Sequence, residues 1–254
     1  MPEKMRLSGK RLTATLVTAL TLALSGCSMD TTAPGSARQD AASDAKGSFG
    51  PVDCRKAKCI ALTFDAGPGK DTPELLDILK ERKVHATFFL LGKHHVLKYP
   101  ETVQRIEDEG HEVANHTWTH KILTDEKPDG IRAELEKTQT AIERVTGKKP
   151  RLMRPPQGRT DDQVSKISKE LGLSQVLWSA TAKDYSTNDS ALITKRIVDQ
   201  ASKDGVILLH DIYKGTVPAV PGIVDALQKD GYTFVTVPEL MAPAVPEPGT
   251  IYRP

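Results

Sequence analysis

The chain has 254 residues, of which 38% are hydrophobic and 27% charged, a composition typical of a globular protein with one large, well-buried domain. Aromatic residues make up 5% and the formal net charge is +2, so neither an aromatic stacking surface nor a strong basic field for nucleic acid is indicated. The positive charge belongs to the N-terminus: without residues 1–26, 31 basic residues stand against 32 acidic ones.

Residues 1–26 have the pattern of an export signal. Four basic residues precede the apolar run "LTATLVTALTLAL", which is short for a membrane span, and small residues close it. A short membrane anchor is the alternative. The closing "LSGC" resembles the lipobox of bacterial lipoproteins, which implies that Cys27 is lipidated and tethers the protein to the outer face of the membrane.

The segment 27–51 is rich in Ser, Ala, Asp, Gly and Pro, and it predicts a flexible tether. Cys54 and Cys59 follow closely in "CRKAKC". Two nearby cysteines outside the cytoplasm usually pair, so we expect a disulfide. A metal site is the weaker alternative, because no further cysteine or local histidine completes it.

Short apolar runs then alternate with amphipathic segments. Strands are predicted at 59–64, 86–92, 111–116, 151–156, 175–180, 205–211 and 233–240, and helices at 72–83, 100–110, 131–147, 161–172, 190–205 and 220–231. This alternation favours parallel βαβ units, and about seven of them indicate an α/β fold with barrel-like closure over residues 52–242. An open doubly wound sheet is the alternative, but no G-x-G-x-x-G follows the first strand. The Pro-rich tail 243–254 is expected to be irregular.

Polar residues capable of chemistry follow these predicted strands. The C-terminal ends of barrel strands share one face, and active sites lie there. The residues in question are Asp65, His116, His120, Arg154, Asp184, His210 and Asp211.

The residue types suggest how these positions act. His116 and His120 are four apart, so a helical turn would place both imidazoles on one side, close enough to share a metal. His210 leaves a continuous apolar run, a partly dry setting in which a histidine pKa suits proton transfer. A buried Arg154 needs a carboxylate partner, for which Asp65 is the candidate. Packing histidines and a surface ion pair are the structural alternatives.

The ordered motifs "TFDAGP", "HTWTH", "RPPQG", "WSATAKDY" and "LLHD" together resemble those of the NodB-type polysaccharide deacetylases, carbohydrate esterase family 4. The resemblance spans about residues 63–211. It implies a distorted (β/α) barrel that removes acetyl groups from N-acetylglucosamine polymers or acetylated xylan with a divalent metal, often zinc, with cobalt or nickel as alternatives.

The resemblance also implies roles for individual residues. Asp65 matches the general base, and His116 and His120 match metal ligands. Arg154 matches the residue that orients the base. His210 matches the general acid, and Asp184 the carboxylate that tunes its pKa. The Gln157 backbone N–H stands where the family donates to the oxyanion, and Leu208 or Leu209 are candidates for the wall around the acetyl methyl group.

One departure from the family pattern lies at the metal site. The family has two adjacent aspartates, the second of which is the third metal ligand, whereas this chain has Ala66 there. Losing one ligand is expected to weaken metal binding by about tens- to hundreds-fold. Water filling the gap is the expectation, with Asp65 moving onto the metal or a metal-poor, slow site as alternatives.

The resulting expectation is an exported, monomeric, metal-dependent deacetylase of acetylated glycans such as peptidoglycan or chitin, which contacts the membrane only through its lipid. A catalytically weak glycan-binding relative and an acetylxylan esterase are the alternatives.

Overall fold

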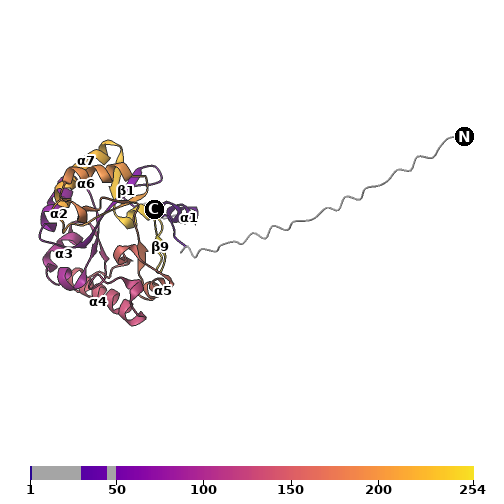
Figure 1. The fold of residues 1–254 in the computed structure, drawn as a ribbon. Coiled ribbons are helices and arrows are strands. Elements are labelled where there is room, and N and C mark those ends of the chain that lie inside the picture. Colours follow the sequence, from indigo (N-terminus) through magenta and orange to yellow (C-terminus); the bar gives the residue numbers. More distant parts are fainter. Residues whose placement is uncertain (2–29, 45–49) are drawn as a thin grey trace.

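The computed structural model describes Met1, residues 30–44 and residues 50–254 (Figure 1). The expected export signal and the expected lipidation site Cys27 lie outside the described residues. Within the described part of the chain, no helix is both long enough and apolar enough to cross a bilayer.

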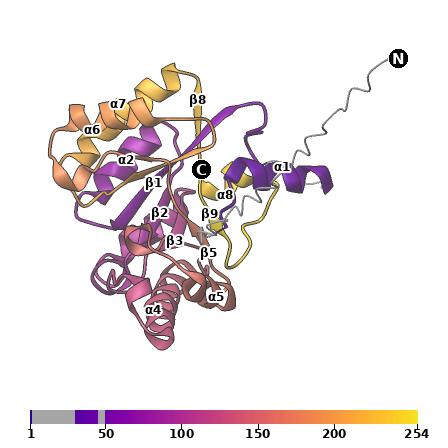
Figure 2. The same ribbon diagram turned by 45° about the vertical axis from the view of Figure 1, so that its right-hand side comes forward.

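Among the described residues, nine strands form a single sheet, and all of their pairings are parallel (Figure 2). They are β1 (Lys58–Gly67), β2 (Thr87–Leu90), β3 (Glu112–Asn115), β4 (Leu152–Met153), β5 (Ser174–Val176), β6 (Ala180–Thr181), β7 (Gly205–Leu209), β8 (Tyr232–Val235) and β9 (Ile251–Tyr252). The order is β6-β7-β1-β2-β3-β4-β5-β9, and β8 also pairs with β1. The predicted α/β class and its barrel-like parallel sheet are confirmed. No pairing between described residues joins β6 to β9, so the barrel is open there.

Most of the helices lie around the outside of this sheet (Figure 1). They are α1 (Pro34–Asp44), α2 (Thr72–Glu81), α3 (Pro100–Asp108), α4 (Pro128–Thr146), α5 (Asp162–Glu170), α6 (Ser190–Gln200), α7 (Thr216–Lys229) and α8 (Val237–Met241). The predicted helices are all present, although α7 begins four residues earlier than predicted and α6 ends five residues earlier. The expected single strand at 175–180 is divided into β5 and β6, so a short break replaces its middle.

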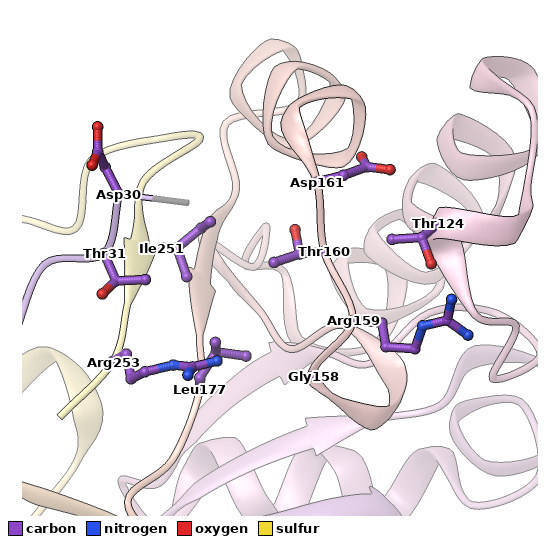
Figure 3. A pocket seen from close by; sticks show the side chains of 10 residues that line it. All are labelled: Asp30, Thr31, Thr124, Gly158, Arg159, Thr160, Asp161, Leu177, Ile251 and Arg253. Atoms are coloured by element: carbon purple, nitrogen blue, oxygen red, sulfur yellow. The ribbon is translucent and has the colours of Figure 1, made fainter. Parts of the chain in front are cut away.

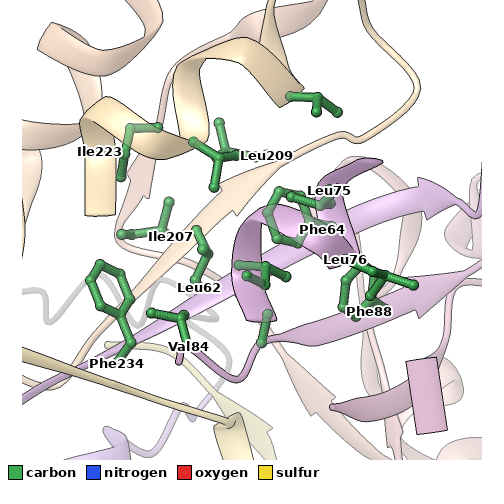
Figure 4. Close-up of a cluster of buried hydrophobic side chains, with 14 of the residues drawn as sticks. Leu62, Phe64, Leu75, Leu76, Val84, Phe88, Ile207, Leu209, Ile223 and Phe234 are labelled. Carbon is green, nitrogen blue, oxygen red and sulfur yellow. The ribbon is translucent and has the colours of Figure 1, made fainter. Parts of the chain in front are cut away.

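A large apolar core lies between the sheet and the helices. Leu62 and Phe64 of β1 pack there with Ile207 and Leu209 of the neighbouring strand β7 (Figure 4). The rings of Phe64 and Phe88 stack with centroids 5.2 Å apart. These side chains are fully buried, which fixes the register of the three central strands.

Strand alternation directs the other side chains of β1 away from this core. Thr63 pairs with Leu208 and Phe64 pairs with Leu209 in the β1–β7 register. Because successive residues face opposite sides of a strand, Thr63, Asp65 and Leu208 face the side on which polar residues gather. Leu209 belongs to the apolar core, which corrects its expected place beside the acetyl group.

The predicted disulfide is present at the entrance to β1. Cys54 and Cys59 are bonded, with Cα atoms 5.5 Å apart, and both are buried in a second apolar cluster with Val206, Val235 and Leu240. The bridge therefore closes a short loop that packs beneath the sheet.

The expected tether is partly folded. Residues 34–44 form helix α1, and its Arg38 is buried. The guanidinium donates to Asp204 at 2.6 Å and to the Leu240 carbonyl at 2.7 Å. A flexible tether over the whole of 27–51 was therefore wrong, because a buried ion pair and a carbonyl bond hold this helix against the domain.

The Pro-rich tail is not irregular throughout. Ile251 and Tyr252 form β9, which pairs with β5 and extends the sheet. Thr32 bridges to Tyr252 on the other side of β9. Two segments expected to be unstructured thus form one edge of the sheet.

Candidate active site

Asp65 and Arg154 form a buried ion pair. The Arg154 guanidinium donates to Asp65 Oδ1 at 2.7 Å, to Thr63 Oγ1 at 2.8 Å and to the Val176 carbonyl at 2.9 Å, and it lies 4.0 Å from the centroid of the Phe89 ring. Burial lowers the pKa of Arg154, and the adjacent Asp65 carboxylate opposes that shift. The several fixed donors hold the carboxylate in one orientation, as a group that moves a proton requires.

His116 presents a free lone pair toward Asp65. Its Nδ1 lies 2.8 Å from the Arg154 carbonyl, which can only accept, so Nδ1 carries the proton and Nε2 does not. Burial lowers the pKa of His116 to about 4, so the ring is neutral at pH 7. Its Nε2 is 3.8 Å from Asp65 Oδ2, beyond hydrogen-bonding distance.

His120 lies beside His116, with ring centroids 4.9 Å apart. The two rings come together as the spacing predicted, but not through a helical turn. Thr117 and His120 both have positive φ angles, and the segment is an irregular loop. Glu134 of α4 fixes this loop by accepting from the backbone N–H groups of Trp118 and Thr119.

His210 and Asp184 form the second acid–base pair. The Asp184 carboxylate accepts from His210 Nδ1 at 2.8 Å, from the His210 backbone N–H at 2.7 Å and from Thr216 Oγ1 at 2.8 Å. Burial would lower the pKa of His210, but the hydrogen bond and charge of Asp184 together with the charge of Asp65 outweigh it, and the pKa is raised. His210 is therefore suited to hold a proton and donate it.

These side chains line one cavity of about 560 Å³ on the face of the sheet where the parallel strands end. Arg154 and Asp184 stand behind Asp65 and His210 and are almost fully buried. The cavity is lined by Asp65, His116, His120, Gln157, Trp178, Thr181, Lys183, Tyr185, Leu208, His210 and Tyr213. Of the candidate catalytic, metal-binding and substrate-contacting residues that the structure describes, two face elsewhere: Leu209 lies in the apolar core, and Asp211 lies against Thr72 and Gly67.

The side chains that could bind a metal meet part of what a metal site requires. Asp65 Oδ2 and His116 Nε2 are two acceptors that face each other with no proton between them, an arrangement that suits a cation. His120 adds a second imidazole. As placed, these three side chains do not yet form a complete ligand set: among Met1, residues 30–44 and residues 50–254, no group of three or more His, Cys, Asp or Glu side chains is positioned to hold a metal ion.

Ala66 occupies a distinctive backbone position beside this donor set. The β1–β2 register shifts between Asp65 and Gly67, so Ala66 is the extra residue of a β-bulge, with a φ of 65°. Left-handed backbone is unfavourable for alanine and better tolerated by Asp and Asn. The backbone therefore keeps a conformation that suits an aspartate better than the residue present.

Asp211 is a buried carboxylate that the sequence analysis places at a strand end without a specific role. Its Oδ2 accepts from Thr72 Oγ1, which in turn accepts from the Gly69 N–H at 2.7 Å. A Cβ added to Gly67 would lie 2.4 Å from Asp211 Oδ1, so the carboxylate fills the space against this glycine. Asp211 thus joins the turn after Asp65 to the loop that carries His210. The one sequence feature that pointed to Asp211 was its place within the motif "LLHD".

Replacing Thr72 with valine is expected to lower the free energy of unfolding by about 1–3 kcal/mol, because the Asp211 carboxylate and the Gly69 N–H both lose their partner in a buried site. Thr72→Ser keeps the hydroxyl and is the matched control, with a smaller loss. Denaturant unfolding of the two variants measures the difference. A larger loss in Thr72→Ser than in Thr72→Val would show that the methyl group, and not the hydrogen bonds, secures the turn.

Comparison with known proteins agrees with this geometry. The sequence pattern of the family described as polysaccharide deacetylase matches residues 53–176. The chain is 39% identical over 184 residues to the peptidoglycan-N-acetylglucosamine deacetylase PgdA of Listeria monocytogenes, covering 72% of this chain and 39% of PgdA. It is 36% identical over 191 residues to the peptidoglycan-N-acetylmuramic acid deacetylase PdaA of Bacillus subtilis, covering 73% of this chain and 72% of PdaA.

A solved structure of the T48 deacetylase with substrate superposes with a TM-score of 0.76 at 41% identity, covering 79% of this chain and 99% of that one. The chain spans only about two fifths of the length of PgdA, so the match concerns one region of that relative. The fold, the grouped motif residues and the similarity over most of PdaA lead to one conclusion: the chain belongs to the polysaccharide deacetylase family, carbohydrate esterase family 4.

Proposed function

We propose that this protein is a divalent-metal-dependent hydrolase that removes N-acetyl groups from N-acetylglucosamine-containing glycans of the peptidoglycan or chitin type. The main observation behind this proposal is that Asp65 and His210, two groups able to transfer a proton, line the same cavity. Each is held by a buried partner: Arg154 holds Asp65, and Asp184 holds His210. The acetylated peptidoglycan substrates named for PgdA and PdaA support the choice of glycan.

His116 and His120 would hold the metal, which we propose to be zinc, with cobalt or nickel as substitutes. When bound, such an ion polarises the acetyl carbonyl and lowers the pKa of a coordinated water. The neutral state of His116 and its hydrogen bond to the Arg154 carbonyl leave Nε2 ready for this ligand role.

Asp65 acts as general base and takes the proton from the attacking water, with its orientation set by Arg154. His210 enters the reaction protonated and gives its proton to the leaving amine, which otherwise departs as a strongly basic anion. The Gln157 backbone N–H would donate to the oxyanion. Leu208, which lines the cavity, would contact the acetyl methyl group.

Acetate release from N-acetylglucosamine oligomers tests the proposal. Release by the purified protein is expected to fall on chelation and to return when Zn²⁺ or Co²⁺ is added. Absence of acetate at every metal concentration, together with an Asp65→Asn variant that behaves like wild type, would contradict an enzymatic role.

Replacing Asp184 with asparagine is expected to move the alkaline limb of the pH–rate profile to lower pH. His210 must be protonated, so the rate falls as pH rises through its pKa, which Asp184 holds above the ordinary 6.5. Removing the charge lowers that pKa, and each unit reduces the protonated fraction on the alkaline side about tenfold. The exposed Asp199→Asn on α6 is the control and should leave the limb in place. An unmoved limb in Asp184→Asn would show that another group controls it.

A second candidate function is a catalytically weak relative that binds the glycan. Ala66 at the third ligand position is the observation that favours it. Such a protein would bind N-acetylglucosamine oligomers without releasing acetate at any metal concentration, so the acetate assay separates the two functions.

We further propose that the protein is exported and lipid-anchored at Cys27, on the outer face of the bacterial membrane, as a monomer. The sequence "LSGC" after an apolar run supports this placement. Mass spectrometry of the membrane fraction tests it: an unmodified cysteine there, or an uncleaved N-terminus, would contradict lipidation.

A further inference from the structure

A second cavity, of about 860 Å³, lies beyond the C-terminal ends of three strands of the same sheet (Figure 3). Gly158, Leu177 and Arg253 line it, and they follow the C-terminal ends of β4, β5 and β9. The catalytic cavity also lies at the C-terminal ends of strands of this sheet, among them β1 and β7. Because the strands are parallel, both cavities lie at the same end of the sheet, beyond the C-terminal ends of the strands.

The two cavities are neighbours. Gln157 lines the catalytic cavity, and the residue after it, Gly158, lines the second cavity. Trp178 also lines the catalytic cavity, and the residue before it, Leu177, lines the second. A Cβ added to Gly158 would lie 3.0 Å from the Trp178 ring. Residues that are adjacent in the sequence thus line the two cavities, so a linear polymer could extend from one cavity to the other.

Segments at the two ends of the chain build the far wall. The Thr32 N–H donates to the Ile251 carbonyl at 2.9 Å, and the Arg253 N–H donates to the Thr32 carbonyl at 3.0 Å. These bonds hold Thr31 and Arg253 at the cavity (Figure 3). Both segments lie outside residues 53–176, which match the family pattern.

The lining suits a sugar ring. Hydroxyl and charged groups surround the cavity, and Leu177 and Ile251 form an apolar floor. Two of the charged groups are already engaged: Arg159 pairs with Asp125, and Asp161 caps α5 through the Val164 N–H. Within the described parts of the chain, the exposed Arg253 side chain makes no ion pair, which leaves its guanidinium available to sugar oxygens.

We infer that this second cavity binds a neutral sugar residue of the same glycan chain, beyond the reacting unit, and that Arg253 is its principal hydrogen-bond donor. The inference rests on the proposed function for the identity of the glycan. It gives the chain a preference for longer oligomers through contacts remote from the acetyl group, made by residues that take no part in the reaction.

Calorimetric binding of the N-acetylglucosamine dimer and hexamer tests this site, with a chelator present and acetate assayed to verify that no turnover occurs. Wild-type protein should bind the hexamer more tightly than the dimer. Arg253→Ala should weaken hexamer binding about tenfold, the effect of one hydrogen bond to a charged group, and leave the dimer unchanged. Arg253→Lys should fall between the two. Arg144→Ala, which removes an exposed arginine from α4, is the control and should change neither.

Equal weakening of dimer and hexamer by Arg253→Ala, or no effect on either, would overturn the inference, as would equal affinities of wild-type protein for both oligomers. Thermal unfolding of each variant verifies that the fold is intact, since Arg253 is exposed and its removal should leave the unfolding temperature unchanged. Failure of the proposed function has a different result, namely no acetate release at any metal concentration, whatever the oligomers' affinities.

Discussion

Replacing Asp65 with asparagine is expected to reduce the rate of acetate release by about 10²- to 10⁴-fold, the contribution of a positioned general base. Asparagine has the same shape and still accepts one hydrogen bond from Arg154, but it cannot take a proton from water. The loss should appear in kcat, because Gln157, Trp178 and Leu208, which line the cavity beside Asp65, are unchanged.

The same replacement leaves the buried Arg154 without its countercharge, so stability must be measured beside activity. Breaking a buried ion pair costs about 3–5 kcal/mol when nothing else holds the remaining charge. Here the guanidinium keeps its bonds to Thr63 and the Val176 carbonyl, so a smaller loss is expected. Asp129→Asn, at an exposed position in the first turn of α4, is the control and should alter neither quantity appreciably. A folded Asp65→Asn protein that keeps more than a tenth of the wild-type rate would exclude Asp65 as the base.

The positions of the candidate catalytic residues could be predicted from the sequence because parallel strands end at one face. Asp65 follows a predicted strand, and Arg154 and His210 lie near the C-terminal ends of two others, so topology brings them together before any contact is known. The pairing of Arg154 with Asp65 also followed from a simple requirement, since a buried guanidinium needs a carboxylate.

Features that depend on long-range contacts could not be predicted. Helix α1 has no apolar stripe and the composition of a linker, and its attachment depends on Arg38 meeting Asp204, 166 residues away. Strand β9 is two residues long and forms only because β5 offers an open edge. The proximity of His116 and His120 was predicted, but its local cause was not, because positive φ angles at non-glycine residues leave little trace in a sequence.

Replacing Ala66 with aspartate is expected to raise the affinity for Zn²⁺ by about tens- to hundreds-fold, the scale of changes to a ligand shell. The resemblance to the family implies a metal ligand at this position, between Asp65 and the Gly67 turn. Aspartate tolerates the φ of 65° better than alanine does, so the bulge can accept it without rearrangement. Affinity is measured by calorimetry or by competition with a chelating dye, so the result does not depend on turnover.

The matched control is Ala66→Asn, which shares the tolerance for left-handed backbone and the size of aspartate but has no charge. If a carboxylate ligand is what the site lacks, Asp raises zinc affinity strongly and Asn does so little. If backbone strain at the bulge is the limit, both substitutions raise stability and affinity alike. Unchanged zinc affinity in Ala66→Asp would show that this position does not face the ion, and that His116, His120 and water, or Asp65 itself, form the complete ligand set.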